Sequence, residues 1–206
     1  MPALCGLNTT SELRKYLCAL YYLAQIDSEI LDQIVTRLRS VLTGFDGFEF
    51  NTTETNRIGF SARFADVRGL VPAVNLSDGT LSLIGMLVLL FSAARPPVMF
   101  LEEPENGLTP RSTRAIYEAV LEAASPVADR RSQILIASHS PFVIVQAWNG
   151  EERDFIYQMK SDEGIARVRP LKEALEAQGV QLRKKGGERS ELGLRTADLV
   201  MDGYLS

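Results

Sequence analysis

The stretch VMFLEEP, residues 98–104, decides how this chain folds. Its four apolar residues predict a short buried strand, which runs straight into Glu102 and Glu103. A helical pattern over residues 111–124 and a second apolar run over residues 133–137 come next along the chain. Strands that alternate with helices predict an α/β fold with parallel strands flanked by helices, and the functional groups of such folds lie on loops at the carboxyl ends of the strands.

The first part of the chain has a different pattern. Apolar residues recur at three- and four-residue intervals over residues 11–43, which predicts two helices separated at Asp27-Ser28, with Ser28 as the N-cap of the second. Short alternating runs over residues 48–51 and 58–64 predict an antiparallel hairpin that turns around residues 53–56. We therefore expect a helical lid followed by a small β insert before the parallel strands begin.

Later segments complete the expected order of elements. We expect a helix over residues 80–94 and another that begins near Pro141. Residues 155–159 and 165–168 read as a hairpin, and residues 171–177 as a short helix before a polar tail.

Composition restricts the class of protein. The chain has 206 residues, 46% of them hydrophobic and 23% charged, which is typical of a folded domain and argues against intrinsic disorder. The net charge of -4 does not indicate a generally basic surface for nucleic acid. The apolar run over residues 81–94 falls short of the roughly 20 residues of a membrane span. Residues 2–11 have neither a basic start nor a sustained apolar run, so we do not expect a secretory signal. Cys5 and Cys18 match neither a metal motif nor a disulfide framework, so we expect a cytoplasmic protein.

Two further segments carry chemistry. In LSDGT, residues 76–80, Ser77 offers a hydroxyl and Gly79 allows close approach of backbone N–H groups at a helix start, where an anion is favoured. The alternative is an ordinary helix cap. In ILIASHS, residues 134–140, His139 follows the second apolar strand and is the single histidine of the chain. The alternative to a functional role for His139 is an incidental surface or core histidine. For the glutamates after residue 101, the alternative is a solvated acidic turn.

The three segments, in this order, resemble the C-terminal half of an ABC-type nucleotide-binding domain of SMC-like soluble ATPases. The glutamate-rich form EEPE at residues 102–105 is similar to the ATPases related to the overcoming-lysogenization-defect family. The resemblance implies that Glu102 holds the Mg²⁺ shell and Glu103 orients or deprotonates the attacking water, while His139 contacts the γ-phosphate of ATP. In that family the ABC signature engages ATP held by the opposite subunit. The residues of this chain that match the signature are Ser77, Asp78, Gly79 and Thr80.

One element of that family is missing from the sequence. None of the 15 glycines is followed by lysine, so the Gly-Lys-Ser/Thr loop that cradles the phosphates is not encoded here. We therefore expect a partial P-loop NTPase fold with three parts: a helical lid and β insert over residues 1–70, an ABC-type C-terminal lobe over residues 71–170, and a short helix with a polar tail over residues 171–206. The family also often has histidine before the proline where this chain has Thr109.

The sequence is compatible with two functions. The first is an ATP-hydrolysing domain that needs a Walker A lobe from elsewhere, with ATP and Mg²⁺ as ligands and a homo- or hetero-oligomer as the working form. The alternative is a non-catalytic regulatory or dimerisation partner of a complete ATPase. A nucleic-acid contact through residues 183–189 is a further option, whereas a nuclease is disfavoured because the tail offers only scattered acids.

Overall fold

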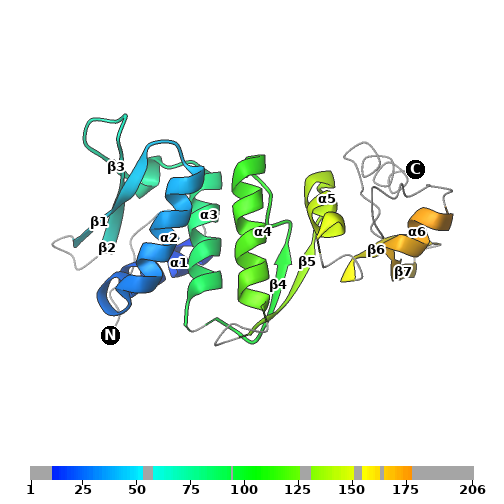
Figure 1. Cartoon of the computed structure of the whole chain (residues 1–206). Helices are drawn as coiled ribbons and strands as arrows, with labels where there is room; N and C mark the ends of the chain where they lie inside the picture. Colours follow the sequence, from blue (N-terminus) through cyan, green and yellow to red (C-terminus); the bar gives the residue numbers. More distant parts are fainter. Residues whose placement is uncertain are drawn as a thin grey trace. The chain divides into compact units, whose positions relative to one another are not determined.

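The computed structural model describes residues 11–52, 58–93, 95–125, 131–150, 155–162 and 165–177. The chain divides into two compact units, Met1–Ile136 and Ala137–Ser206, and each is described by itself. The boundary falls at the end of the second predicted parallel strand. The structure confirms the α/β class with helix-flanked parallel strands (Figure 1).

Two helices open the first unit, as the sequence predicts. They are α1 (Ser11–Ile26) and α2 (Ser28–Val41), which follow one another across Asp27. The prediction that Ser28 caps α2 is wrong. Asp27 is the N-cap, because its carboxylate accepts a hydrogen bond from the N–H of Ile30 at 3.2 Å and Ser28 is already the first helical residue.

The predicted hairpin is part of a three-stranded antiparallel sheet in the order β1-β2-β3. Its strands are β1 (Phe45–Thr52), β2 (Ile58–Phe64) and β3 (Leu70–Pro72). Phe48 pairs with Ala62 and Phe50 with Phe60, so one face is aromatic and packs toward α1 and α2. The predicted turn at residues 53–56 lies outside the described residues.

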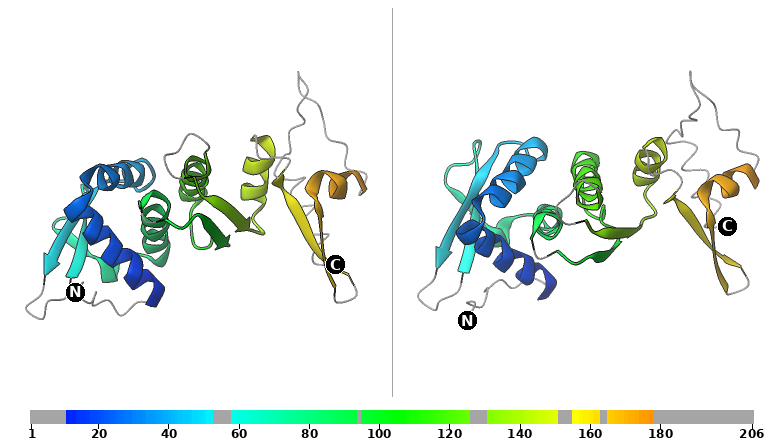
Figure 2. Two further views of the ribbon diagram at one scale, coloured as in Figure 1. Left: turned by 90° about the horizontal axis from the view of Figure 1, so that it is seen from below. Right: turned by 60° about the horizontal axis from the view of Figure 1, so that its bottom comes forward.

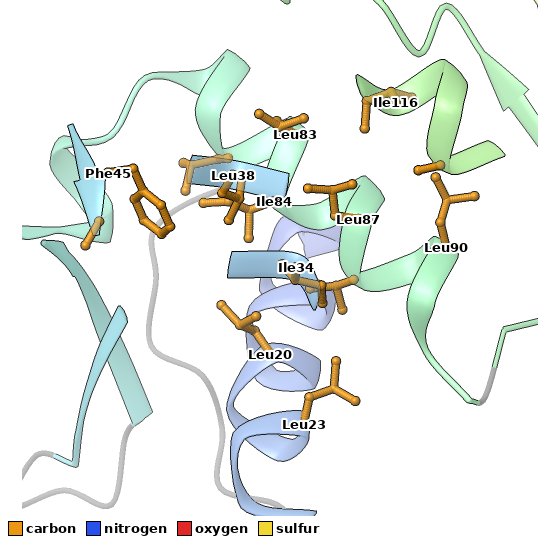
Figure 3. Packing of buried hydrophobic residues seen from close by; sticks show 14 of the residues in the cluster. Leu20, Leu23, Ile34, Leu38, Phe45, Leu83, Ile84, Leu87, Leu90 and Ile116 are labelled. Carbon is orange, nitrogen blue, oxygen red and sulfur yellow. The ribbon is translucent and has the colours of Figure 1, made fainter. Parts of the chain in front are cut away.

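The helix after the signature-like segment is the centre of the first unit. It is α3 (Asp78–Phe91), reached through the short 3-10 helix η1 (Ala73–Asn75), and it contacts α1, α2 and α4 (Pro110–Ala124). Because α3 is apolar on nearly all sides, it is buried on nearly all sides. Figure 3 shows the packing of its side chains against those of the neighbouring helices and β1, and these residues are labelled there: Leu20, Leu23, Ile34, Leu38, Phe45, Leu83, Ile84, Leu87, Leu90 and Ile116.

One cation joins three of these helices at the surface. The guanidinium of Arg37 on α2 forms a salt bridge with Glu122 on α4 and lies 4.9 Å from the ring centroid of Phe91 on α3. The guanidinium therefore combines an ion pair with a cation–π contact.

The parallel part of the fold consists of β4 (Val98–Glu102) and β5 (Gln133–Ala137), which are hydrogen-bonded neighbours. The helix α4 forms the crossover between them, as a parallel pair requires. The carboxyl ends of both strands therefore lie at one edge of the sheet. Figure 2 shows these two strands beside α4.

The second unit has its own small core. It contains α5 (Pro141–Asn149), the antiparallel hairpin of β6 (Tyr157–Asp162) and β7 (Ile165–Pro170), and α6 (Leu171–Ala177). Trp148, Leu171 and Leu175 are buried together, and the N–H of Leu171 donates to the carbonyl of Ile156 at 2.9 Å. The predicted helix near Pro141, the hairpin and the helix over residues 171–177 are confirmed, whereas the polar tail and residues 183–189 lie outside the described part. Across all described residues, no helix is long and apolar enough to span a membrane.

Candidate functional site

The acidic loop, defined here as residues 102–109, begins where β4 ends. Side chains alternate along β4, so Glu102 falls on the same face as Val98 and Phe100, and all three are exposed. Glu103 leaves the strand with φ 44°, the left-handed region that non-glycine residues seldom adopt. This backbone turn ends the alternation at Glu103 and is the kind of local strain that often occurs at functional sites.

Hydrogen bonds hold the loop in two consecutive tight turns. The N–H of Asn106 donates to the carbonyl of Glu103, and the N–H of Leu108 donates to the carbonyl of Glu105, both at 2.9 Å. One carboxylate oxygen of Glu105, Oε2, is buried, so Glu105 is not a freely solvated acid. The alternative of a simply solvated acidic turn therefore does not describe Glu105.

The loop ends on a helix cap. Thr109 is the N-cap of α4, its hydroxyl accepting from the N–H of Ser112 at 3.2 Å, and Pro110 occupies the first turn. Thr109 thus has a local structural role as the cap of α4.

The signature segment, residues 76–80, forms the start of α3. Ser77 is the N-cap, with its hydroxyl accepting from the N–H of Thr80 at 3.1 Å and lying 2.9 Å from the Thr80 hydroxyl. Asp78 occupies the first turn, where its negative charge is favoured by the helix dipole. The helix start is therefore capped by its own residues, and Ser77 and Asp78 are exposed to solvent.

The signature segment and the acidic loop touch through two glycines. A Cβ atom on Gly79 would lie 2.2 Å from the carbonyl oxygen of Gly107 and 3.2 Å from its carbon. Gly107 itself has φ 74°, a conformation that favours glycine. Residue 79 therefore has to be glycine for the backbones to approach this closely.

His139 follows β5 by two residues and is exposed. Between β5 and α5, the hydroxyl of Ser138 accepts a hydrogen bond from the N–H of Ser140 at 3.0 Å. The structure brings the signature segment and the acidic loop together within the first unit. His139 belongs to the second unit and is therefore described separately.

The carboxylates of the acidic loop fit a magnesium site that water and phosphate oxygens complete. Among the described residues, no group of three or more His, Cys, Asp or Glu side chains could hold a metal ion as a closed protein cage. Mg²⁺ bound to nucleotides usually takes only one or two carboxylates and completes its shell with water and phosphate oxygens. The exposed carboxylate of Glu102 at a strand end fits that arrangement.

A sequence model of a known family matches residues 19–145, more than half of the chain. That family is described as "AAA domain, putative AbiEii toxin, Type IV TA system". The chain belongs to this AAA domain family. The matched residues of the AAA domain include the signature segment, the acidic loop and His139. No curated protein matches the chain.

Solved structures support the same assignment at the level of fold. One comes from work on ATP-driven dimerization and DNA-stimulated activation of SMC ATPases, with 12% identity and a TM-score of 0.53, covering 82% of this chain and 99% of that one. Another is the SmcHead bound to the C-winged helix domain of ScpA, with 10% identity and a TM-score of 0.55, covering 81% of this chain and 56% of that one. The chain thus spans about half of the second structure's length. The AAA domain shares the fold of SMC ATPase heads, and the expected resemblance to SMC/ABC-like ATPases is confirmed.

From the sequence, Gly107 belongs to a loop that resembles the family's D-loop, residues 105–108, but no contact with Gly79 is predicted and no role is assigned to Thr109. The dipeptide Asn106-Gly107 is a turn signal and could have indicated the positive φ. The contact with Gly79 has no local signal, because the two residues are brought together only when α3 packs beside the acidic loop.

Proposed function

We propose that this AAA domain is the signature, acidic-strand and histidine half of an SMC/ABC-like ATPase, which hydrolyses ATP when a Walker A lobe from elsewhere completes it. The observation that carries the proposal is the bare face of the β4–β5 sheet, defined by Val98, Phe100 and Leu135. These side chains are 57%, 67% and 47% exposed, whereas Met99 on the opposite face of β4 is 4% exposed. Parallel sheets are ordinarily covered on both faces, so another layer is expected here.

The opposite face of the same sheet is covered in the ordinary way. Leu101, Ile134 and Ile136 are partly buried against the core that contains α3 and α4. The bare face is therefore confined to one side, and Glu102 extends it to the carboxyl end of β4. A lobe that covered this face could hold a nucleotide at the carboxyl ends of the strands. That nucleotide would then lie close to Glu102.

The sequence favours a separate source for the phosphate-binding loop. No Gly-Lys-Ser or Gly-Lys-Thr occurs in the 206 residues, and the backbone nest and lysine of such a loop make most contacts to the β- and γ-phosphates. The residues of this chain would then complete a nucleotide site that another lobe begins.

In the assembled site each residue has one task. The carboxylate of Glu103 accepts a proton from the attacking water and aligns that water with the γ-phosphorus. Glu102 would hold the water shell of Mg²⁺, which when bound would supply positive charge beside the phosphates. His139 donates a hydrogen bond to the γ-phosphate. The signature segment of this chain closes over ATP held by the opposite subunit. Its residues in this role are Ser77, Asp78, Gly79 and Thr80.

The proposed working form is a dimer or a larger assembly, since a signature segment acts on a partner's nucleotide. The SMC ATPases named above undergo ATP-driven dimerization, which supports this part of the proposal by analogy of fold. A regulatory partner that never hydrolyses ATP is the alternative. The presence of both Glu103 and His139 favours the catalytic function, because a regulatory half needs neither.

Calorimetry with ATP and Mg²⁺ tests the proposal. The chain alone should bind ATP weakly, and affinity and turnover should appear when a polypeptide with a Gly-Lys-Ser/Thr loop, such as one encoded immediately upstream, is supplied. Micromolar affinity for ATP by the chain alone, about -8 kcal/mol, would contradict the proposal because it would require a second phosphate site within these residues. Affinity without turnover in the completed complex would support the regulatory alternative.

A further inference from the structure

We infer that Gly79 and Gly107 are positioning residues whose backbone contact makes the signature segment and the acidic loop move as one body. The inference rests on the proposed function for its meaning in catalysis, but the contact can be tested without nucleotide. It assigns to Gly79 a role within its own chain, besides any approach to a phosphate.

The first step is the contact itself. A Cβ on Gly79 would stand 2.2 Å from the carbonyl oxygen of Gly107, and atoms of a backbone cannot give way as the end of a flexible side chain can. The same Cβ would reach the Leu108 side chain at 3.9 Å, which is ordinary van der Waals contact. Any side chain at residue 79 must therefore displace the acidic loop or the start of α3.

The second step links Gly107 to Glu103. The N–H of Asn106 is bonded to the carbonyl of Glu103, and the N–H of Leu108 to that of Glu105, so Gly107 lies within two closed turns. Thr109 then anchors the end of the loop to α4. Because the loop is closed in this way, a displacement of the Gly107 carbonyl is transmitted to the backbone of Glu103.

The third step links Gly79 to Ser77. The hydroxyl of Ser77 accepts from the N–H of Thr80, and its carbonyl accepts from the N–H of Leu81 at 3.0 Å. Gly79 lies inside this capped first turn. When the signature segment closes on a partner's nucleotide, the movement therefore passes through Gly79 to Gly107 and sets the position of Glu103.

The two glycines differ in what they tolerate. The contact at residue 107 is made by its carbonyl, and a Cβ there would lie 4.0 Å from the Cα of Gly79, so space is not the restriction. Only the positive φ restricts this position, and asparagine adopts that conformation more readily than other non-glycine residues. Gly107→Asn should thus preserve the coupling that Gly79→Ala breaks.

Amide hydrogen exchange on the full chain tests the coupling. Gly79→Ala should raise exchange of the amides of residues 103 and 105–108 by roughly tenfold, although replacing glycine by alanine in a helix ordinarily stabilises it. Gly47→Ala is the matched control, since a Cβ there meets nothing within 4 Å, and should leave these amides unchanged. Wild-type exchange of the amides of residues 103 and 105–108 in Gly79→Ala would overturn the inference.

A second variant covers the case in which Gly79→Ala does not fold. Thr109→Ala removes the hydroxyl that anchors the acidic loop to α4 and leaves every residue of α3 as it is. Coupling predicts that exchange at the amides of Thr80 and Leu81 rises several-fold, with α2 unchanged. Here the acidic loop is perturbed and the signature segment is measured. Wild-type exchange at these two amides would overturn the inference.

Kinetics of a completed ATPase give a readout that a purely structural role would not move. Gly79→Ala should lower kcat by about tenfold or more with KM for ATP changed little, because the phosphate-binding loop lies elsewhere. A proportional rise in KM with unchanged kcat would contradict the positioning role. If no ATPase activity exists in the completed complex, the proposed function fails while the exchange result still stands or falls by itself.

Discussion

Phe100 and Glu102 lie on the same face of β4, two residues apart, at the edge where the acidic loop begins. The ring of Phe100 is 67% exposed, although it sits in a strand of a parallel pair. An apolar surface beside a candidate Mg²⁺ ligand fits a site that another lobe completes.

Self-association of the chain should depend on this bare face. Light scattering should show species larger than the 22.8 kDa monomer that grow with concentration, and Phe100→Glu should shift them toward the monomer. Val74→Glu is the control, since Val74 is 61% exposed but lies on η1, which contacts β2 of the antiparallel sheet. A wild-type chain that stays at the monomer mass over a wide concentration range would contradict the prediction.

The core around α3 should dominate stability. Leu87 is fully buried, so Leu87→Ala should lower the free energy of unfolding by about 2–5 kcal/mol, measured by urea denaturation. Val74→Ala removes an exposed side chain and should change it by less than about 0.5 kcal/mol. Equal effects of the two substitutions would mean that α3 is not the centre of the folded unit.

Residues with a strong local pattern could be placed from the sequence. The run QILIA predicts β5 over residues 133–137, which is where the strand lies, and α3 is buried along its length as the apolar run predicts. The order of strand, helix and strand in β4, α4 and β5 followed from the same patterns. Local periodicity was sufficient because each element packs one or more apolar faces against the core.

Helix starts were less certain, because neighbouring polar residues compete for the cap. Ser28 has the right chemistry, yet Asp27 is the residue whose carboxylate reaches the N–H of Ile30. The helix after the signature also begins at Asp78 rather than at residue 80, since Ser77 caps it. Which of two adjacent polar residues leaves the helical backbone conformation depends on how the preceding helix ends.

This correction gives a direct stability test. Asp27→Ala should lower the free energy of unfolding by about 1 kcal/mol, because one N–H at the start of α2 loses its acceptor. Ser28→Ala, one residue along, should change it by less than about 0.5 kcal/mol. A larger loss from the serine variant, measured by the same urea titration, would restore Ser28 as the cap.

Features that depend on tertiary contacts could not be predicted. An apolar strand such as β4 reads as buried on both faces, so no local pattern indicated that Phe100 in particular is exposed. The approach of Gly79 to Gly107 joins positions 28 residues apart, 79 to 107, and depends on how α3 lies against the acidic loop. Both features lie at the candidate site, where local patterns and function often diverge.

The most direct test of the proposed function compares two glutamates of the acidic loop in the completed ATPase. Glu103→Gln keeps the shape and hydrogen bonding of the side chain but removes the base, so turnover should fall about 10²-fold or more while ATP binding survives. Glu105→Gln should lower turnover much less. Because Oε2 of Glu105 is buried, the free energy of unfolding of the Glu105→Gln variant is measured in parallel, so that a loss of stability is not mistaken for a loss of catalysis. Equal, small losses of ATPase rate in the two variants would contradict the role of Glu103 and, with it, the proposed function.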